Sequence, residues 1–233
     1  MIPWLGIEPG APFPPVERAL TRPDGLLAAG GDLSLERLVN AYGQGIFPWY
    51  SEGQPILWWS PDPRCVLFCA QMHVSRRLER RLRTSGWRFT LDRAFEQVVD
   101  ACAAPRADDA GTWITPAMRA AYLDLHRHGL AHSLEAWRGN TLVGGIYGVA
   151  LGRIFFGESM FHSEADASKA CLVMLCRQLE RWGFPLLDCQ VHSPHLERMG
   201  AELIPRERFG DWLRHVGQAG PDGWALDTDL AGG

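Results

Sequence analysis

Three polar side chains interrupt stretches whose other residues are typical of buried strands. Asp188 and Gln190 lie in the stretch PLLDCQVHSP, and Glu158 lies in the stretch RIFFGESMF. Residues two apart on a strand share a face, so Asp188 and Gln190 are predicted to lie side by side. Burying a carboxylate without a partner costs free energy. One such group can be a satisfied residue at a sheet edge, but three among phenylalanines indicate a pocket with convergent polar groups.

The elements that must position these residues follow from the turns between them. The segments HSLEAWR, TLVGGIYGVA and RIFFGESMF are separated by the short turns GN and LG, which predicts an antiparallel three-strand meander. A helix follows, with Ser163 and Asp166 resembling a capping box and with Gly183 and Pro185 as its end. The strand of Asp188 comes next. This order predicts an α+β fold in which a helix packs on a mostly antiparallel sheet.

Two further helices are expected before the meander. TLDRAFEQVVDACA reads as a helix capped by Thr90. TPAMRAAYLDLHRHG has Thr115 as N-cap, Pro116 in the first turn and Gly129 at the end.

The composition changes near residue 62. Before that point Pro, Gly and aromatic residues dominate, with one short helix after Ser34 that ends near Gly43. We therefore expect a small N-terminal domain over residues 1–62 and a second domain over residues 63–216. The last stretch, residues 217–233, is expected to be a flexible tail.

Composition and charge are those of an ordinary soluble protein. The chain is 46% hydrophobic and 21% charged. No signal peptide is visible, and no apolar run reaches the roughly 18 residues of a membrane helix. Six irregularly spaced cysteines are typical of reduced thiols, so a cytoplasmic location is expected. A net charge of −4 argues against non-specific nucleic-acid binding but allows a local basic face.

A basic face is suggested by the segment SRRLERRLR, in which Ser75 is a plausible N-cap. Helical spacing would gather Arg76, Arg80 and Arg83 on one stripe. The alternatives are a solvated helix face and a phosphate-binding surface. The phosphate-binding candidates are Arg76, Arg77, Arg80, Arg81 and Arg83.

A family resemblance is carried by an ordered set of stretches between about Pro14 and Arg208: PDGLLAAGGDLS, GIFPWYSEGQPILWWSPDPR, GTWIT, LVGGIYGV, GESMF, ASK and DCQV. Together they resemble the leucyl/phenylalanyl-tRNA–protein transferases of bacteria. The resemblance implies a C-terminal domain with the acetyltransferase-like (GNAT) fold. It also implies transfer of Leu or Phe, and Met less well, from tRNA to proteins that begin with Arg or Lys, which marks them for degradation by the N-end rule. The expected partners are aminoacyl-tRNA and acceptor proteins; we expect a monomer without cofactor, metal or membrane contact.

The implied chemistry assigns roles to the polar residues. The donor ester is already activated and the nucleophile is an amine, so positioning supplies much of the catalysis. Gln190 is too weak a base to keep the amine proton, but its carbonyl can accept a hydrogen bond from the amine while its amide donates to Asp188. Asp188 is then the expected local base. Glu158 is expected to face the positive charge of the acceptor.

The resemblance also implies the substrate-binding residues. Ile146, Phe155, Leu175 and Leu187 would line an apolar slot for the donor side chain. Trp49 and Trp113 would stack near the terminal adenosine. The arginine cluster then fits the acceptor stem of the tRNA.

Three other functions fit the sequence less well than aminoacyl transfer. An acyl-CoA acetyltransferase needs a glycine-containing pyrophosphate loop before its long helix, where this chain has FHSEADASKA. A zinc site from Cys189, His192 and His195 lacks a fourth ligand. A non-enzymatic RNA-binding module does not need three polar groups in an apolar pocket.

Overall fold

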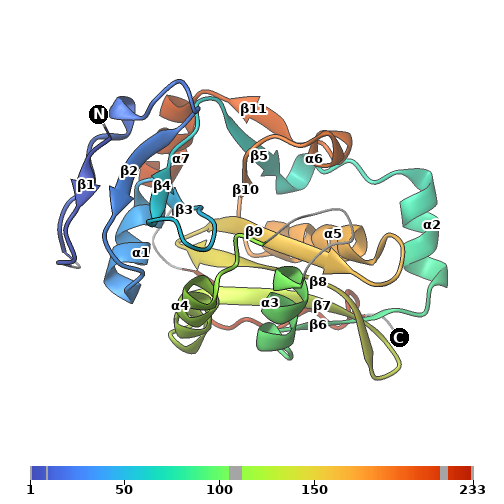
Figure 1. Ribbon diagram of the computed structural model, residues 1–233. Coiled ribbons are helices and arrows are strands. Elements are labelled where there is room, and N and C mark those ends of the chain that lie inside the picture. The colour runs from blue at the N-terminus through green and yellow to red at the C-terminus, as the bar shows by residue number, and fades with distance from the viewer. Residues whose placement is uncertain (1, 9, 105–111, 216–219, 232–233) are drawn as a thin grey trace.

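The computed structural model describes residues 2–8, 10–104, 112–215 and 220–231, and their strands form two sheets (Figure 1). In the described N-terminal region a four-stranded sheet has the order β1-β2-β4-β3. Its strands are β1 (Trp4–Leu5), β2 (Leu26–Gly30), β3 (Phe47–Pro48) and β4 (Leu57–Trp59). Helix α1 (Leu35–Gly43) follows β2, and Ser34 caps it by accepting a hydrogen bond from the backbone N–H of Arg37, so the expected helix is confirmed.

The second sheet has seven strands in the order β11-β5-β10-β9-β8-β7-β6 among the residues described. The neighbours β9 and β10 are parallel, and every other pair is antiparallel. The α+β class is therefore confirmed, with a mixed rather than purely antiparallel sheet. The strands are β5 (Arg64–Phe68), β6 (Arg88–Leu91), β7 (Ala131–Arg138), β8 (Thr141–Leu151), β9 (Ile154–His162), β10 (Leu186–Gln190) and β11 (Glu202–Ile204).

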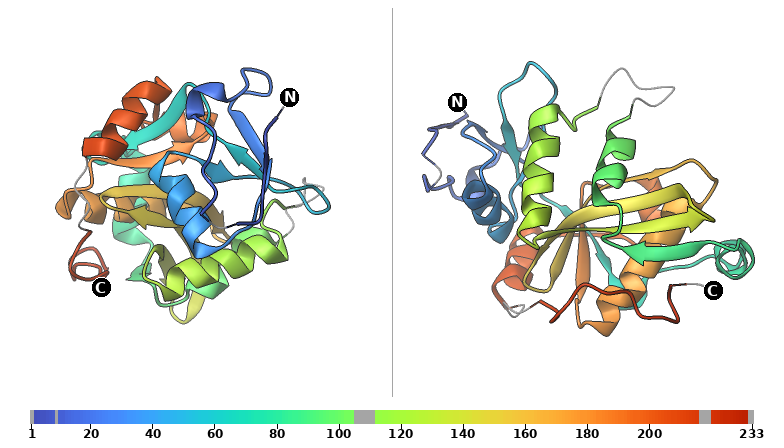
Figure 2. Two further views of the ribbon diagram at one scale, coloured as in Figure 1. Left: turned by 90° about the vertical axis from the view of Figure 1, so that its left-hand side faces the viewer. Right: turned by 90° about the horizontal axis from the view of Figure 1, so that it is seen from below.

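The meander β7-β8-β9 and the helix after it form as the turn signals indicate. Parallel neighbours need a crossover connection, and α5 (Ala167–Arg181) supplies it between β9 and β10. Figure 2 shows α3 (Phe95–Ala103) and α4 (Pro116–Arg127) on one side of this sheet and α5 on the other. The remaining helical elements are α2 (Arg76–Thr84), α6 (Pro194–Arg198), α7 (Arg206–His215) and two short 3-10 turns at Val16–Arg18 and Cys69–Gln71.

Two of the expected helix starts are wrong, whereas those at Ser34, Ser75 and Thr115 are confirmed. Thr115 caps α4 by accepting from the N–H of Met118. Thr90 does not cap α3, because it lies within β6, where its hydroxyl donates to Glu135. Ser163 and Asp166 form no capping box, since no side chain caps α5 and the hydroxyl of Ser163 donates to the carbonyl of Val143.

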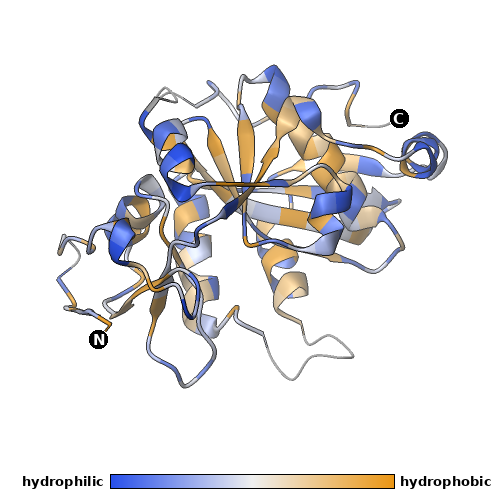
Figure 3. Cartoon of the chain, turned by 90° about the horizontal axis from the view of Figure 1, so that it is seen from above, coloured by the Kyte–Doolittle hydropathy of each residue, from blue (hydrophilic) through white to orange (hydrophobic). Residues whose placement is uncertain are grey.

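The core consists of two apolar clusters on opposite faces of the large sheet. The first continues from the N-terminal sheet to the large sheet, for instance through Trp58, Tyr42 and Phe156, all of which are fully buried. The expected boundary at residue 62 thus falls between the two sheets, yet the two parts share one core. The strands of the large sheet are mainly apolar, whereas α2 is strongly hydrophilic (Figure 3). No helix in the described ranges is long and apolar enough to span a membrane.

The C-terminal stretch packs on the large domain, which corrects the expectation of a flexible tail. The ring of Trp224 stacks on His132 with 3.6 Å between centroids, and Leu230 is buried in the second cluster. Arg181 binds the carboxylates of Asp227 and Asp229 at 2.7 Å each. An aromatic ring and a leucine that bury against the domain hold residues 220–231 in place; residues 217–219 and 232–233 lie outside the described ranges.

Candidate active site

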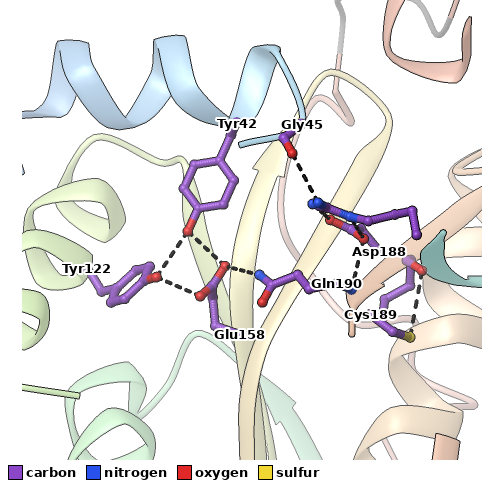
Figure 4. Close-up of polar contacts among 9 residues, drawn as sticks. Tyr42, Gly45, Tyr122, Glu158, Asp188, Cys189 and Gln190 are labelled. Atoms are coloured by element: carbon purple, nitrogen blue, oxygen red, sulfur yellow. Dashed lines mark hydrogen bonds and ion pairs between the residues drawn. The ribbon is translucent and has the colours of Figure 1, made fainter. Parts of the chain in front are cut away.

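Glu158 on β9 is enclosed by hydrogen-bond donors from three other elements (Figure 4). Its Oε1 accepts from the hydroxyl of Tyr42 on α1 at 2.7 Å and from Nε2 of Gln190 on β10 at 2.9 Å. Its Oε2 accepts from the hydroxyl of Tyr122 on α4 at 2.6 Å. The two tyrosine hydroxyl oxygens are themselves 3.0 Å apart. The polar centre thus joins the N-terminal region, α4 and two strands of the large sheet.

The protonation of Glu158 is balanced near neutrality. Loss of solvation raises its pKa to about 7, although the hydrogen bonds from Tyr122, Tyr42 and Gln190 lower it, and the charge of Asp188 raises it. The pKa values of both tyrosines are well above the ordinary value of 10.0, mainly because of burial, so their hydroxyls stay protonated. Glu158 can therefore change between acid and carboxylate at physiological pH, as a proton-transfer group must.

The number of protons available to Glu158 and the two tyrosines also indicates that Glu158 can hold a proton. Three oxygen–oxygen contacts join Tyr42, Tyr122 and Glu158, but the two hydroxyls bring only two protons. With Glu158 ionised, one of the three contacts has no proton in it. A proton on Glu158 supplies the third hydrogen bond, so the network accommodates a proton that arrives there.

Asp188 has a different partner from the one expected. It forms a two-pronged ion pair with Arg64 of β5, in which Nε donates to Oδ1 at 2.8 Å and Nη2 donates to Oδ2 at 2.6 Å. Both side chains are buried. Arg64 also donates to the carbonyl of Gly45 at 3.0 Å and lies over the rings of Phe47 and Phe209. The ion pair thereby ties β5 and β10 to the N-terminal region.

The expected hydrogen bond from the side-chain amide of Gln190 to Asp188 is wrong. The backbone N–H of Gln190 donates to Asp188 at 2.9 Å, and the side-chain amide donates to Glu158. The register of β10 against β5 shifts between Asp188 and Gln190, and Gln190 has a φ of +63°. This bulge re-aims the side chain toward β9. Asp188 therefore positions Gln190 through its backbone.

A pocket of about 370 Å³ opens beside this polar centre. The parallel pairing of β9 and β10 stops at Phe156 and Asp188, and the pocket lies where the two strands continue beyond that point. Glu158 and Gln190 supply polar groups to it. Its apolar lining includes Ile146, Met160, Leu172, Leu187, Val191 and Leu196.

Four of the six predicted substrate-binding residues line this pocket. Ile146, Leu187, Trp49 and Trp113 do so, and Trp49 is 43% exposed. Phe155 and Leu175 are not part of the described lining; they are fully buried in the same apolar cluster as Ile146 and Leu187. The residue of α5 that reaches the pocket is Leu172, one helical turn before Leu175.

The five predicted phosphate-binding arginines lie on α2, which Ser75 caps as expected. Arg77 donates to Asp166 at 3.0 Å, Arg81 lies over the ring of Trp87, and Arg83 is 3.7 Å from Glu79. Arg76 and Arg80 are exposed. None of the five lines the pocket between β9 and β10, so their phosphate contacts remain a prediction about a separate surface.

Three residues of the polar centre were not predicted from the sequence: Tyr42, Tyr122 and Arg64. Each has a weak local signal. Tyr42 and Tyr122 lie on the buried faces of amphipathic helices, where the hydroxyl of a tyrosine needs a partner. Arg64 opens the apolar strand RCVLF, and a buried cation needs a buried anion.

Comparisons with known proteins place this architecture in one family. The family model described as leucyl/phenylalanyl-tRNA protein transferase matches residues 66–214, and the model of that family's N-terminal domain matches residues 31–62. A leucyl/phenylalanyl-tRNA–protein transferase of Alkalilimnicola ehrlichii is 58% identical over 97% of this chain and 90% of its own length. One of Xanthomonas euvesicatoria pv. vesicatoria is 60% identical over 88% of this chain and 82% of its own.

Similarity to solved structures is weak. The structure of L-PGS from Bacillus licheniformis has a TM-score of 0.41 and 11% identity, over 72% of this chain and 53% of that one. A GCN5-related N-acetyltransferase-like protein from Streptococcus suis has a TM-score of 0.33 and 17% identity, over 70% and 61%. Neither value supports a conclusion about fold, whereas the sequence matches do establish a relationship. The chain belongs to the leucyl/phenylalanyl-tRNA–protein transferase family.

Proposed function

We propose that the chain transfers Leu or Phe, and Met less well, from aminoacyl-tRNA to the N-terminal amino group of proteins that begin with Arg or Lys. Such transfer would mark these proteins for degradation by the N-end rule in the cytoplasm. The names of the relatives support the reaction. The observation that supports the proposal most is the pocket between β9 and β10. It combines an apolar slot with Glu158, whose carboxylate accepts hydrogen bonds from Tyr42 and Tyr122.

The donor would enter this pocket with its side chain among the apolar residues. The volume of about 370 Å³ accommodates a Leu or Phe side chain, and Ile146, Leu172 and Leu187 offer apolar contacts to either. Apolar pockets discriminate by only about 1–3 kcal/mol per methylene, so several apolar side chains are accepted. Trp49 and Trp113 lie in the same lining and would stack on the terminal adenosine, which contributes roughly 1–3 kcal/mol per base.

The transfer step needs one group that takes a proton and returns it. An α-amino group has a pKa near 7.7–8.0, so part of it is neutral in the cytoplasm and attacks the ester carbonyl carbon. As the C–N bond forms, the amine loses a proton; as the C–O bond to the ribose breaks, the leaving oxygen gains one. Glu158 lines the pocket, and its pKa of about 7 suits it to both transfers. This role replaces the sequence-based assignment of Asp188 as the base.

Gln190 and Asp188 would then orient the reaction. Because Nε2 of Gln190 donates to Glu158, its carbonyl oxygen is left to accept a hydrogen bond from the attacking amine. Asp188 holds the backbone N–H of Gln190 and is itself held by Arg64. The acceptor's positive charge would lie near the carboxylate of Glu158.

The finer fold assignment is also part of this proposal. We infer an acetyltransferase-like domain over residues 63–216 that follows a small domain over residues 1–62, in a monomeric protein. Supporting it are the meander, the crossover helix α5 and the divergence of the parallel pair β9–β10. The loop before α5 carries Glu164 and Asp166 rather than a glycine-rich pyrophosphate site, which favours an aminoacyl donor over acetyl-CoA.

A transfer assay tests the proposal directly. The purified chain is incubated with Phe-tRNA or Leu-tRNA and with two peptides that differ only in their first residue, Arg or Ala. We expect a new peptide bond on the Arg peptide and none on the Ala peptide. Acetyl-CoA serves as the competing donor. Acetylation without aminoacyl transfer would identify an acetyltransferase, and tRNA binding without any product would identify an RNA-binding module.

A further inference from the structure

A second cavity, of about 410 Å³, is lined by residues of α2, of the start of α5 and of α6; Figure 1 labels these three helices. Arg77 from α2, Lys169 from α5 and Arg198 from α6 line it, together with Asp166. Its other lining residues are His73, Ser75, Leu78, His195 and Met199. Two of these helices, α2 and α5, pack directly against each other. None of these residues lines the first pocket, and Arg77 is one of the five predicted phosphate-binding arginines.

The cavity carries a net positive charge. Three cationic side chains face one carboxylate, and that carboxylate is shared, since Asp166 accepts from Arg77 at 3.0 Å and from Lys169 at 2.9 Å. Arg198 is exposed and forms no ion pair with any residue in the described ranges. Burial lowers the pKa of His195, and the positive charges of Lys169 and Arg198 lower it further. An anion that enters the cavity therefore meets cations from three elements.

Helix α6 separates this cavity from the candidate active site. Ser193, its N-cap, and Leu196 line the first pocket, whereas His195 and Arg198 line the second. Residues three apart lie on one face of a helix, so the two pairs occupy two different faces. An α-helix with its side chains is about 10–12 Å across. A nucleotide strand that leaves the first pocket beside α6 can therefore reach the second cavity within a few nucleotides.

We propose that the second cavity binds a backbone phosphate of the single-stranded 3′ end of the donor tRNA, between the adenosine subsite and the exposed arginines Arg76 and Arg80 of α2. This inference rests on the proposed function. Because α6 lines both the first pocket and the second cavity, we expect a strand that runs from Trp49 and Trp113 to Arg76 and Arg80 to follow a path along α6. The cavity places Lys169 and Arg198 along that path, and Asp166 holds Lys169 and Arg77 in position.

Three donors of increasing length test this subsite. Phenylalanyl-adenosine fills only the first pocket, a phenylalanyl-CCA trinucleotide adds the neighbouring phosphates, and Phe-tRNA adds the stem. For Arg198→Ala we expect kcat/KM to fall about tenfold with the trinucleotide and by a similar factor with Phe-tRNA. Phenylalanyl-adenosine should be unaffected. Arg80→Ala on α2 should lower kcat/KM only with Phe-tRNA, and Arg127→Ala, at an exposed arginine on α4, is the matched control.

The outcomes separate the subsite from the proposed function. If Arg198→Ala harms phenylalanyl-adenosine as much as the trinucleotide, α6 supports the active site instead, and the inference is wrong. It is equally wrong if a folded Arg198→Ala variant leaves all three donors unchanged. Lys169→Gln provides a second variant at the same cavity. If the wild-type chain uses none of the three donors, the proposed function fails before the subsite is tested.

Discussion

Glu158 and Asp188 are carboxylates on adjacent parallel strands, and their surroundings are opposite. Asp188 is fully buried against the guanidinium of Arg64. Glu158 is only partly buried, faces the pocket and is enclosed by neutral donors. A buried charge that has a cation opposite it is compensated where it lies. A carboxylate surrounded by neutral groups has no such compensation, and its pKa rises to about 7.

From this difference we infer a structural role for Asp188 and the proposed chemical role for Glu158. The Asp188–Arg64 pair joins β5, β10 and the loop at Gly45, so it stabilises the junction between the two sheets. The Glu158 centre is less stable in its ionised form, which is what makes it able to take up a proton. Loss of solvation without an opposite charge costs stability, and it raises the pKa of a carboxyl toward the range in which it can transfer a proton near neutral pH.

The largest expected effect is on the transfer rate of Glu158→Gln. The amide keeps the size of the side chain but cannot take up the amine proton. Proton transfer by a positioned side chain contributes typically 10²- to 10⁴-fold, so we expect a fall in single-turnover rate of that order. The measurement is peptide-bond formation at saturating Phe-tRNA and Arg peptide, with tRNA affinity determined separately. A rate within threefold of wild type would move the proton acceptor elsewhere.

Removing the charge of Asp188 should act mainly on folding. Asp188→Asn leaves the guanidinium of Arg64 buried without its anion, and breaking a buried ion pair on one side costs about 3–5 kcal/mol. Urea unfolding measures the loss. The double variant Arg64→Met with Asp188→Leu removes both charges and should regain most of the stability. If Asp188→Asn is as stable as wild type but inactive, Asp188 belongs to the reacting centre after all.

The parts of the fold that the sequence predicts correctly are those with local causes. The turns at Gly139 and Gly152, the caps Ser34, Ser75 and Thr115, and the order of strand and helix are each specified within a few residues. A cap fails where pairing between strands overrides it, as at Thr90 in β6. Local patterns also singled out Glu158 and Gln190, which line the pocket, and Asp188, which binds the backbone N–H of Gln190.

The partners of those three residues could not be read from nearby sequence. Arg64 is 124 positions from Asp188, and Tyr42 is 116 positions from Glu158. The direction of the amide of Gln190 depends on a bulge that alternation cannot reveal. That Leu172 rather than Leu175 lines the pocket depends on how α5 packs against strands distant in sequence. Each of these facts arises from packing between distant segments.

The smallest expected effect is on the pH dependence of the unfolding free energy. This effect tests whether Glu158, unlike Asp188, holds a proton near neutral pH. The pKa of Glu158 is about 7 in the folded protein, against an ordinary value of 4.5. Between these values the folded state keeps a proton that the unfolded chain has released, so this group's contribution to stability falls as pH rises and becomes constant above about 7. Each tenfold difference in proton affinity is worth about 1.4 kcal/mol, which gives a total fall on the order of 3 kcal/mol.

The control for this prediction is Glu158→Gln, which does not titrate. The difference in unfolding free energy between wild type and Glu158→Gln should decrease by about 2–3 kcal/mol from pH 5 to pH 8, because contributions from other groups cancel. Both proteins are unfolded in urea at a series of pH values and fitted with one shared slope. A difference that is constant with pH would show that the folded protein does not hold a proton on Glu158 near neutrality. The tyrosine cage would then be a structural feature like the Asp188–Arg64 pair, and the contrast between the two carboxylates would disappear.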